Sequence, residues 1–442
     1  MFISLGGGVL EQEDCQAKQS IEVGIKQTVV SREFYAFPDT SVKGNKVLTT
    51  IDNLEYLLNA LGIVVEYDVI AKKVRILIPS LQGTTDNADN VSLAHILSLA
   101  TKYGLSTKHV PEFIEAIADR HPINSVTNWI ESKPWDGVDR KQAFFDTLTV
   151  AEYFPVELKN LLIHKWLLSA IASAMTPSGF YNRGVLTLQG EQSMGKTSWI
   201  KNLVSDPLLR DRVIKLGHHL DAGDKDSMIT AIGHWIVEIG ELDSSFKKDV
   251  ARLKGFLTSD RDKVRRPYAR AAVETPRKTV FAATVNDSNF LVDPTGNTRF
   301  WTLPLVALNY DHGIDMQQLF AQIMLEFKAG QQWWLSPSQE VWLESFNQSH
   351  RIVSVIEETI FDALDLDRKN DPDLKLMTST QLLIELGFKT PTNQQCREVN
   401  NALRKLLGET KRKRVKGYTK WLVPLKENRI DGLLGTRPKS HF

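Results

Sequence analysis

The stretch Val185-Leu-Thr-Leu-Gln-Gly190-Glu-Gln-Ser-Met-Gly-Lys-Thr197 decides the fold of the central part of this 442-residue chain. A short apolar run leads into G-x-x-x-x-G-K-T, and a helical pattern, Ser198 to Leu203, follows. Gly190 and Gly195 let the backbone wrap around a phosphate with its N–H groups pointing inward, at a helix N-terminus that favours anions. The match at every fixed position, between a strand and a helix, predicts a phosphate-binding loop.

The sequence of this loop also predicts which ligands it binds. Lys196 can reach the β- and γ-phosphates of a nucleotide, and the Thr197 hydroxyl can hold Mg²⁺. We therefore expect ATP and Mg²⁺ as cofactors. The predicted nucleotide-binding residues are Gly190, Glu191, Gln192, Ser193, Met194, Gly195, Lys196, Thr197 and Ser198.

Two further apolar runs, 235–239 and 279–285, end in polar residues. In open α/β sheets, ligands bind at the carboxyl ends of the strands. Glu238 is predicted to hold Mg²⁺ and to polarise the attacking water, with Glu241 as a second acid. The alternative for Glu238 is a salt bridge inside the core, because a buried carboxylate needs a partner. Asn286 can sense the γ-phosphate, although an Asn after a strand commonly forms a turn.

A turn-forming segment, Asp293-Pro-Thr-Gly-Asn-Thr-Arg-Phe-Trp301, places Arg299 beside two aromatic residues. Arginine is always charged, so Arg299 can neutralise charge in a phosphoryl-transfer transition state, in cis or from a neighbouring subunit. The alternative is an ordinary surface ion pair.

In this order, these elements resemble the virulence-associated protein E family (VapE/VirE domain), which belongs with the superfamily 3 helicases of the AAA+ class. The resemblance runs from about residue 124 to residue 305. It includes Asn128-Trp-Ile-Glu-Ser-Lys-Pro-Trp-Asp-Gly-Val-Asp-Arg140, similar to the family's W-D-G-x-x-R lead-in, and the basic segment 253–270, which ends in R-x-P-Y-x-R.

The resemblance implies a DNA helicase that hydrolyses ATP, assembles as a hexameric ring and serves replication of a phage or mobile element. It assigns Lys196 and Thr197 to motif A, Glu238 and Glu241 to motif B, and Asn286 to motif C. Arg299 is similar to an arginine finger that acts across a subunit interface. Thr298 stands where the family usually has a second arginine.

Segment 251–278 is strongly basic, with nine Lys and Arg residues against three acidic ones. The resemblance places a pore hairpin for single-stranded DNA here, between motifs B and C. Basic side chains can follow phosphates and a tyrosine can stack on a base. The predicted contacts are Lys263, Arg265, Arg266, Tyr268 and Arg270. Alternatively, some of these arginines, Arg270 and Arg277 especially, serve the ATP interface.

The C-terminal part predicts a winged helix-turn-helix, because two helical patterns, 379–386 and 394–407, precede a basic hairpin at 411–423. The second helix would suit a major groove. The predicted DNA contacts are Arg404, Lys411, Arg412, Lys413, Arg414 and Lys416. The alternative is a solvated basic face or a small packing module.

The expected fold class is α/β: a P-loop AAA+ core of the superfamily 3 helicase type with smaller units at both ends. Helical spacing at 51–61 and strand alternation at 64–67 and 73–78 indicate an N-terminal α+β unit. The predicted divisions are 1–90 (α+β), 91–150 (helical lead-in), 151–310 (ATPase core), 311–350 (helical lid), 351–430 (winged helix-turn-helix) and 431–442 (tail).

Composition sets further bounds. The 54 basic residues nearly balance 53 acidic ones, but the two DNA-binding candidates, 251–278 and 403–420, carry net charges of +6 and +7, and the rest of the chain is net acidic. Two cysteines exclude a disulfide framework and a four-cysteine zinc site. The N-terminus does not resemble a signal peptide, and the longest apolar stretch, 161–175, is too short to span a bilayer. We expect no membrane partner and a location in the cytoplasm of a bacterial host.

Two other functions stay open. The first is a replication initiator that binds an origin and uses ATP as an assembly switch, without processive unwinding. The second is a small-molecule P-loop kinase, which the basic segment and the predicted winged helix disfavour.

Overall fold

The computed structural model describes residues 36–41, 46–79, 81, 87–181, 183–240, 242, 250–264, 273–287, 291, 297–350 and 355–426. The chain divides into two compact units, one of residues 1–67 and 74–122, the other of residues 68–73 and 123–442. Within the described ranges, no helix combines the length and the hydropathy that a membrane-spanning segment requires.

In its described residues, the N-terminal unit packs three helices and the β1–β2 hairpin around one apolar core. Its elements are α2 (Ile51–Ala60), β1 (Val64–Asp68), β2 (Lys73–Leu77), α3 (Ala88–Lys102) and α4 (Val110–Arg120). The predicted helix and both strands are confirmed. The boundary predicted at residue 90 is wrong, because Ile96 of α3 and Ile114 of α4 are buried in the same core as Leu57 of α2. The unit therefore extends to Pro122.

The larger unit is built on a six-stranded sheet in the order β4-β11-β5-β10-β7-β6. The strands are β4 (Leu148–Val150), β5 (Val185–Gln189), β6 (Ile214–His218), β7 (Ile236–Ile239), β10 (Val280–Val285) and β11 (Phe300–Leu308). β11, β5, β10, β7 and β6 pair in parallel, and β4 is an antiparallel edge strand. The predicted strands in 185–188, 235–239 and 279–285 are confirmed, and so is the α/β class.

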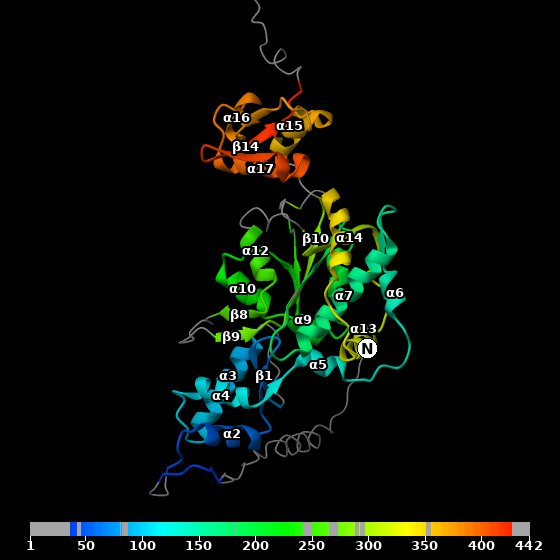
Figure 1. The fold of residues 1–442 in the computed structure, drawn as a ribbon. Helices are drawn as coiled ribbons and strands as arrows, with labels where there is room; N and C mark the ends of the chain where they lie inside the picture. Colours follow the sequence, from blue (N-terminus) through cyan, green and yellow to red (C-terminus); the bar gives the residue numbers. More distant parts are fainter. Residues whose placement is uncertain are drawn as a thin grey trace, which may run out of the picture. The chain divides into compact units, whose positions relative to one another are not determined.

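Continuous apolar strands indicate a sheet covered on both faces, and the packing agrees. Along β10, Val280 and Ala282 join one apolar cluster, whereas Phe281 and Ala283 join a second cluster on the other face. The second cluster is covered by α10 (Lys225–Ile232) and α12 (Val250–Leu257). Figure 1 shows these two helices and α7 (Val156–Met175) on opposite sides of the strands.

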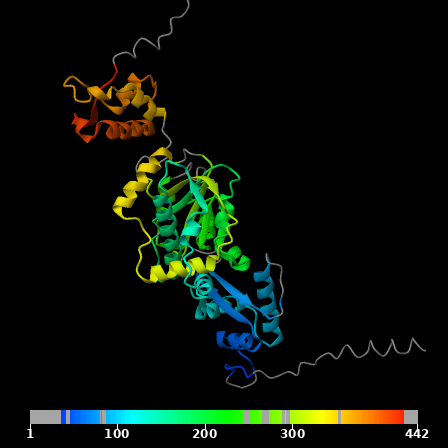
Figure 2. The same ribbon diagram turned by 90° about the vertical axis from the view of Figure 1, so that its right-hand side faces the viewer.

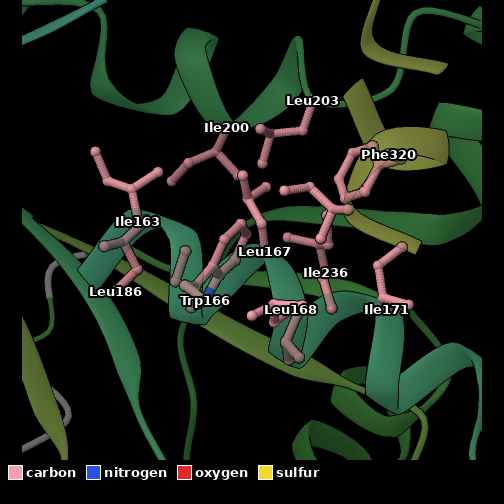
Figure 3. Packing of buried hydrophobic residues seen from close by; sticks show 14 of the residues in the cluster. Ile163, Trp166, Leu167, Leu168, Ile171, Leu186, Ile200, Leu203, Ile236 and Phe320 are labelled. Carbon is pink, nitrogen blue, oxygen red and sulfur yellow. The ribbon is translucent and has the colours of Figure 1, made fainter. Parts of the chain in front are cut away.

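The larger cluster contains buried side chains from a second set of helices in this unit. These helices are α5 (Ser125–Ile130), α6 (Lys141–Phe145), α7, α8 (Lys196–Lys201), α9 (Pro207–Val213), α13 (Met316–Lys328) and α14 (Pro337–Asn347). The predicted buried helix at 161–175 lies within α7, where Trp166 and Leu167 are fully buried against Leu186 of β5 and Ile200 of α8 (Figure 3). Figure 2 shows α13 and α14, in yellow, beside α7.

The C-terminal part of the chain has its own apolar core around Trp421. Its elements are α15 (Val355–Ala363), β12 (Lys375–Met377), α16 (Ser379–Glu385), α17 (Asn393–Leu407), β13 (Arg412–Val415) and β14 (Tyr418–Val423). The strands form a sheet in the order β12-β14-β13. Lys416 and Gly417 both have positive φ, as a two-residue hairpin turn requires. Both predicted helices and the basic hairpin are confirmed.

Candidate functional site

The candidate site lies at the carboxyl ends of three adjacent parallel strands. β10 pairs with β5 on one side and with β7 on the other. This order brings together three polar elements: the glycine-rich loop Gly190–Thr197 after β5, Asn286 after β10, and Glu238 near the end of β7. Strand order, rather than chain order, therefore creates the site.

The glycine-rich loop needs its glycines for steric reasons. Gly195 has φ +100°, and a Cβ there would lie 2.5 Å from a ring carbon of Tyr310. A Cβ on Gly190 would lie 3.0 Å from the carbonyl oxygen of Leu305. Ser193 also has a positive φ, of 65°. Left-handed residues in such a turn direct successive N–H groups into a concave surface, which is a geometry that binds anions.

Lys196 turns back across this loop. Its ammonium is buried and donates to the carbonyl oxygens of Gly190 (2.6 Å) and Glu191 (2.7 Å), and to Asn286 Oδ1 (3.0 Å). Burial lowers the pKa of Lys196, and the charge of Glu238 opposes that shift. Within the described residues, no carboxylate forms an ion pair with this ammonium. A buried cation held by neutral oxygen atoms favours an anionic ligand.

Glu238 is fully buried and accepts three hydrogen bonds. Oε1 accepts from the hydroxyls of Thr197 (2.6 Å) and Thr284 (2.9 Å), and Oε2 accepts from the N–H of Gly217 (3.0 Å). Its partners in the described part of the chain are neutral, so the alternative of a core salt bridge finds no support there. Thr197 and Glu238 provide adjacent oxygen atoms, which are the ligands that Mg²⁺ prefers.

Arg299 lies away from this cluster. It is in a turn directly before β11, and its carbonyl oxygen accepts from the N–H of Val185, the first residue of β5 (2.7 Å). β11 and β5 are parallel, so Arg299 lies at the amino edge of the sheet and the glycine-rich loop at the carboxyl edge. The five residues of β5 separate these edges by about 16 Å. Within one chain, Arg299 is therefore remote from Lys196.

The basic segment contains an antiparallel hairpin of β8 (Arg261–Val264) and β9 (Val273–Pro276). Lys263 is exposed on β8 and lies opposite Glu274. The other predicted contacts of this segment lie outside the described residues, as does the predicted second acid. They are Arg265, Arg266, Tyr268, Arg270 and Glu241.

Arg277 does not serve an ATP interface, contrary to one alternative for the basic segment. It is fully buried and forms a two-pronged ion pair with Asp262 of β8. Its guanidinium carbon lies 4.5 Å from the ring centre of Phe256 and 5.6 Å from that of Phe281. Arg277 therefore anchors the base of the β8–β9 hairpin against the sheet.

We expect Arg277→Ala to destabilise the fold by about 3–5 kcal/mol, because it leaves the Asp262 carboxylate buried without its partner. Urea unfolding, followed by tryptophan fluorescence, measures this change. Lys263→Ala, on the exposed part of the same hairpin, is the control and should change stability by less than about 0.5 kcal/mol. Equal stability of the two variants would contradict a structural role for Arg277.

The predicted contacts in the C-terminal part fall into two groups. Arg404 and Arg412 both contact the carboxylate of Glu409, and these contacts lower the pKa of that carboxyl. The rest lie on or beside the basic hairpin, half-buried or exposed, and form no ion pair within the described residues: Lys411, Lys413, Arg414 and Lys416.

Sequence reasoning missed three exposed side chains in this part. Gln394 and Arg397 lie on the exposed face of α17, one helical turn apart, and Tyr418 is 67% exposed directly after the hairpin turn. The helical period of 393–407 was a signal for the first two, because Val399 and Leu403 mark the opposite, buried face.

The fold and the site together define an α/β protein with a polar site at the carboxyl ends of parallel strands, built on a glycine-rich strand–loop–helix. The virulence-associated protein E-like domain matches residues 130–352, half of the chain, and the chain belongs to that family. The resemblance inferred from the sequence is confirmed.

Among solved structures, the chain is similar to an A form apo structure of the NrS-1 C-terminal region, with 13% identity and a TM-score of 0.38 over 84% of this chain and 98% of that one. A second A form structure of that region gives 13% identity and a TM-score of 0.37, over 84% and 99%. No curated protein matches.

Proposed function

We propose that this protein is an ATP-dependent DNA helicase of the superfamily 3 type, which couples ATP hydrolysis to DNA unwinding during replication of a phage or mobile element. One observation carries the proposal: Lys196, Thr197, Glu238 and Asn286 meet at one edge of the sheet, with direct hydrogen bonds between them. Membership of the VapE-like family supports it. The core would then be a P-loop AAA+ ATPase.

We assign different roles in phosphoryl transfer to different residues of the site. The glycine-rich loop and Lys196 would bind the phosphates, and Thr197 and Glu238 would hold Mg²⁺, which neutralises charge on the phosphate oxygens. The described residues contain no group of three acidic, His or Cys side chains that could hold a metal. Proteins bind Mg²⁺ through one or two carboxylates together with substrate phosphates and water, so Thr197 and Glu238 would suffice on the protein side.

Asn286 and Glu238 would act on the attacking water. The Asn286 amide oxygen lies 3.0 Å from Lys196 Nζ, so its side chain is within reach of the γ-phosphate that Lys196 would contact. It would orient the water, and Glu238 would take its proton. Glu241 stays a prediction as a second acid.

Arg299 would complete the site of a neighbouring subunit. Its distance from the glycine-rich loop of its own chain supports action in trans, which requires an oligomer whose subunits contact head to tail. Such contacts form a ring when the rotation between subunits closes, and we propose a hexameric ring.

DNA would contact two basic regions. Lys263 of β8, together with the contacts predicted from the sequence at Arg265, Arg266, Tyr268 and Arg270, would follow single-stranded DNA in the ring's pore. The order α15-β12-α16-α17-β13-β14 supports a winged helix-turn-helix at the C-terminus. There α17 would enter a major groove, with Gln394 and Arg397 able to contact bases, because amide and guanidinium groups can bond two base-edge atoms at once.

We expect the double variant Lys413→Ala/Lys416→Ala to weaken duplex binding to all DNA sequences alike, because its lysines would contact phosphates. The slope of log affinity against log salt should fall in magnitude by about 1 per lysine. Fluorescence anisotropy over a salt series measures it. Lys375→Ala, at an exposed lysine of β12, is the matched control. An unchanged slope would contradict a phosphate-binding hairpin.

Hydrolysis measured with and without single-stranded DNA tests the proposal against the kinase alternative. We expect DNA to accelerate ATP turnover. The proposed pore hairpin, β8–β9, lies between β7, which carries Glu238, and β10, which Asn286 follows, in the order of the chain. A rate of ATP hydrolysis that is the same with and without DNA would favour a small-molecule kinase. Strand displacement then separates a helicase from an ATP-switched initiator.

A further inference from the structure

Tyr310 lies beside the glycine-rich loop on the side away from Glu238 and Asn286. β5, which leads into the loop, has β10 on one side and β11 on the other. Tyr310 follows the carboxyl end of β11, two residues after Leu308. The polar cluster and Tyr310 therefore flank the loop from opposite sides.

The ring of Tyr310 lies against the backbone of Gly195. A Cβ built on Gly195 would come within 2.5, 3.0 and 3.5 Å of three ring carbons, so only glycine fits beneath the ring. The surrounding backbone is fixed, because the Tyr310 carbonyl oxygen accepts from Asn202 Nδ2 (2.8 Å) and Asn309 N–H donates to the Thr147 oxygen (2.8 Å). Yet the residue is 46% exposed.

We propose that Tyr310 stacks on the base of the bound nucleotide. This inference rests on the proposed ATPase function. The γ-phosphate end of a nucleotide would lie toward Asn286 and Glu238, so the phosphate chain runs across the loop and its nucleoside end emerges toward β11. An exposed aromatic ring held there offers a flat apolar surface to a purine.

Tyr310 would contact the base of the nucleotide, whereas Lys196 would contact its phosphates, so variants of the two residues should respond differently to a ligand that has no base. Tyr310→Ala should weaken ATP binding by about tenfold, the usual effect of losing one base–aromatic stack. It should leave the affinity for Mg²⁺–tripolyphosphate, which has no base, unchanged. Tyr310→Phe should bind both as the wild type does. Tyr153→Ala, at an exposed tyrosine that follows β4, is the control and should change neither affinity.

Isothermal titration of the full-length variants with both ligands decides the matter. Unchanged ATP affinity in Tyr310→Ala would overturn the inference. Equal losses for ATP and tripolyphosphate would overturn it too, because they would show that the ring only supports the loop. The proposed function fails separately, if wild-type protein binds neither ligand or if Lys196→Ala binds both as well as the wild type.

Discussion

Lys196→Ala should lower the rate of ATP hydrolysis by at least about 100-fold, the scale seen when one group that stabilises transition-state charge is removed. The Lys196 ammonium already lies in the loop, held by Gly190, Glu191 and Asn286, and it is the charge that would meet the β- and γ-phosphates. Steady-state hydrolysis with Mg²⁺ and ATP measures the effect, and titration with ATP measures the accompanying loss of affinity.

Lys201→Ala is the matched control for this experiment. Lys201 is an exposed lysine on the same helix, α8, and has no contact with the glycine-rich loop among the interactions of the described residues. It should hydrolyse ATP as the wild type does. Near-normal hydrolysis by Lys196→Ala would show that the loop is not the catalytic phosphate site.

Arg299→Ala should lower the hydrolysis rate by about 10³-fold or more, as removal of an arginine finger does, while ATP affinity changes little. We expect the rate to change without the affinity because Arg299 lies at the amino edge of the sheet. From there it would not contact the nucleotide that its own chain binds. Measuring kcat alongside the dissociation constant for ATP tests both parts.

Mixing the two inactive variants tests the trans role of Arg299. Each Arg299→Ala subunit keeps Lys196, and each Lys196→Ala subunit keeps Arg299, so their shared interface contains both groups. In a randomly mixed ring, about a quarter of the interfaces are complete. Equal mixtures should regain clear activity, whereas a mixture as inactive as its components would argue against a shared site.

The strands and loop of the site were predictable because their signals are local. The apolar runs and the spacing of Gly190, Gly195 and Lys196 specify a strand, a turn and a helix. Their assembly was harder to foresee. Lys196 meets Asn286, 90 residues away, because β10 inserts between β5 and β7, and no short-range pattern encodes that order.

Charge and polarity in the sequence gave wrong predictions at positions where burial in the folded protein determines the role of a residue. Arg277 counted as one more positive charge in a basic segment, but Asp262 and two aromatic rings hold it in the core. Similarly, the sequence analysis placed a division between units at residue 90. The helices α3 and α4 beyond it fill the core started by α2, a long-range contact that composition does not reveal.

ATP-dependent strand displacement on a forked DNA duplex tests the central claim most directly. The helicase account predicts that wild-type protein releases the labelled strand only with Mg²⁺ and ATP, and that Lys196→Ala releases none. DNA-stimulated ATP hydrolysis without any strand release would contradict the account and leave the ATP-switched initiator as the better description.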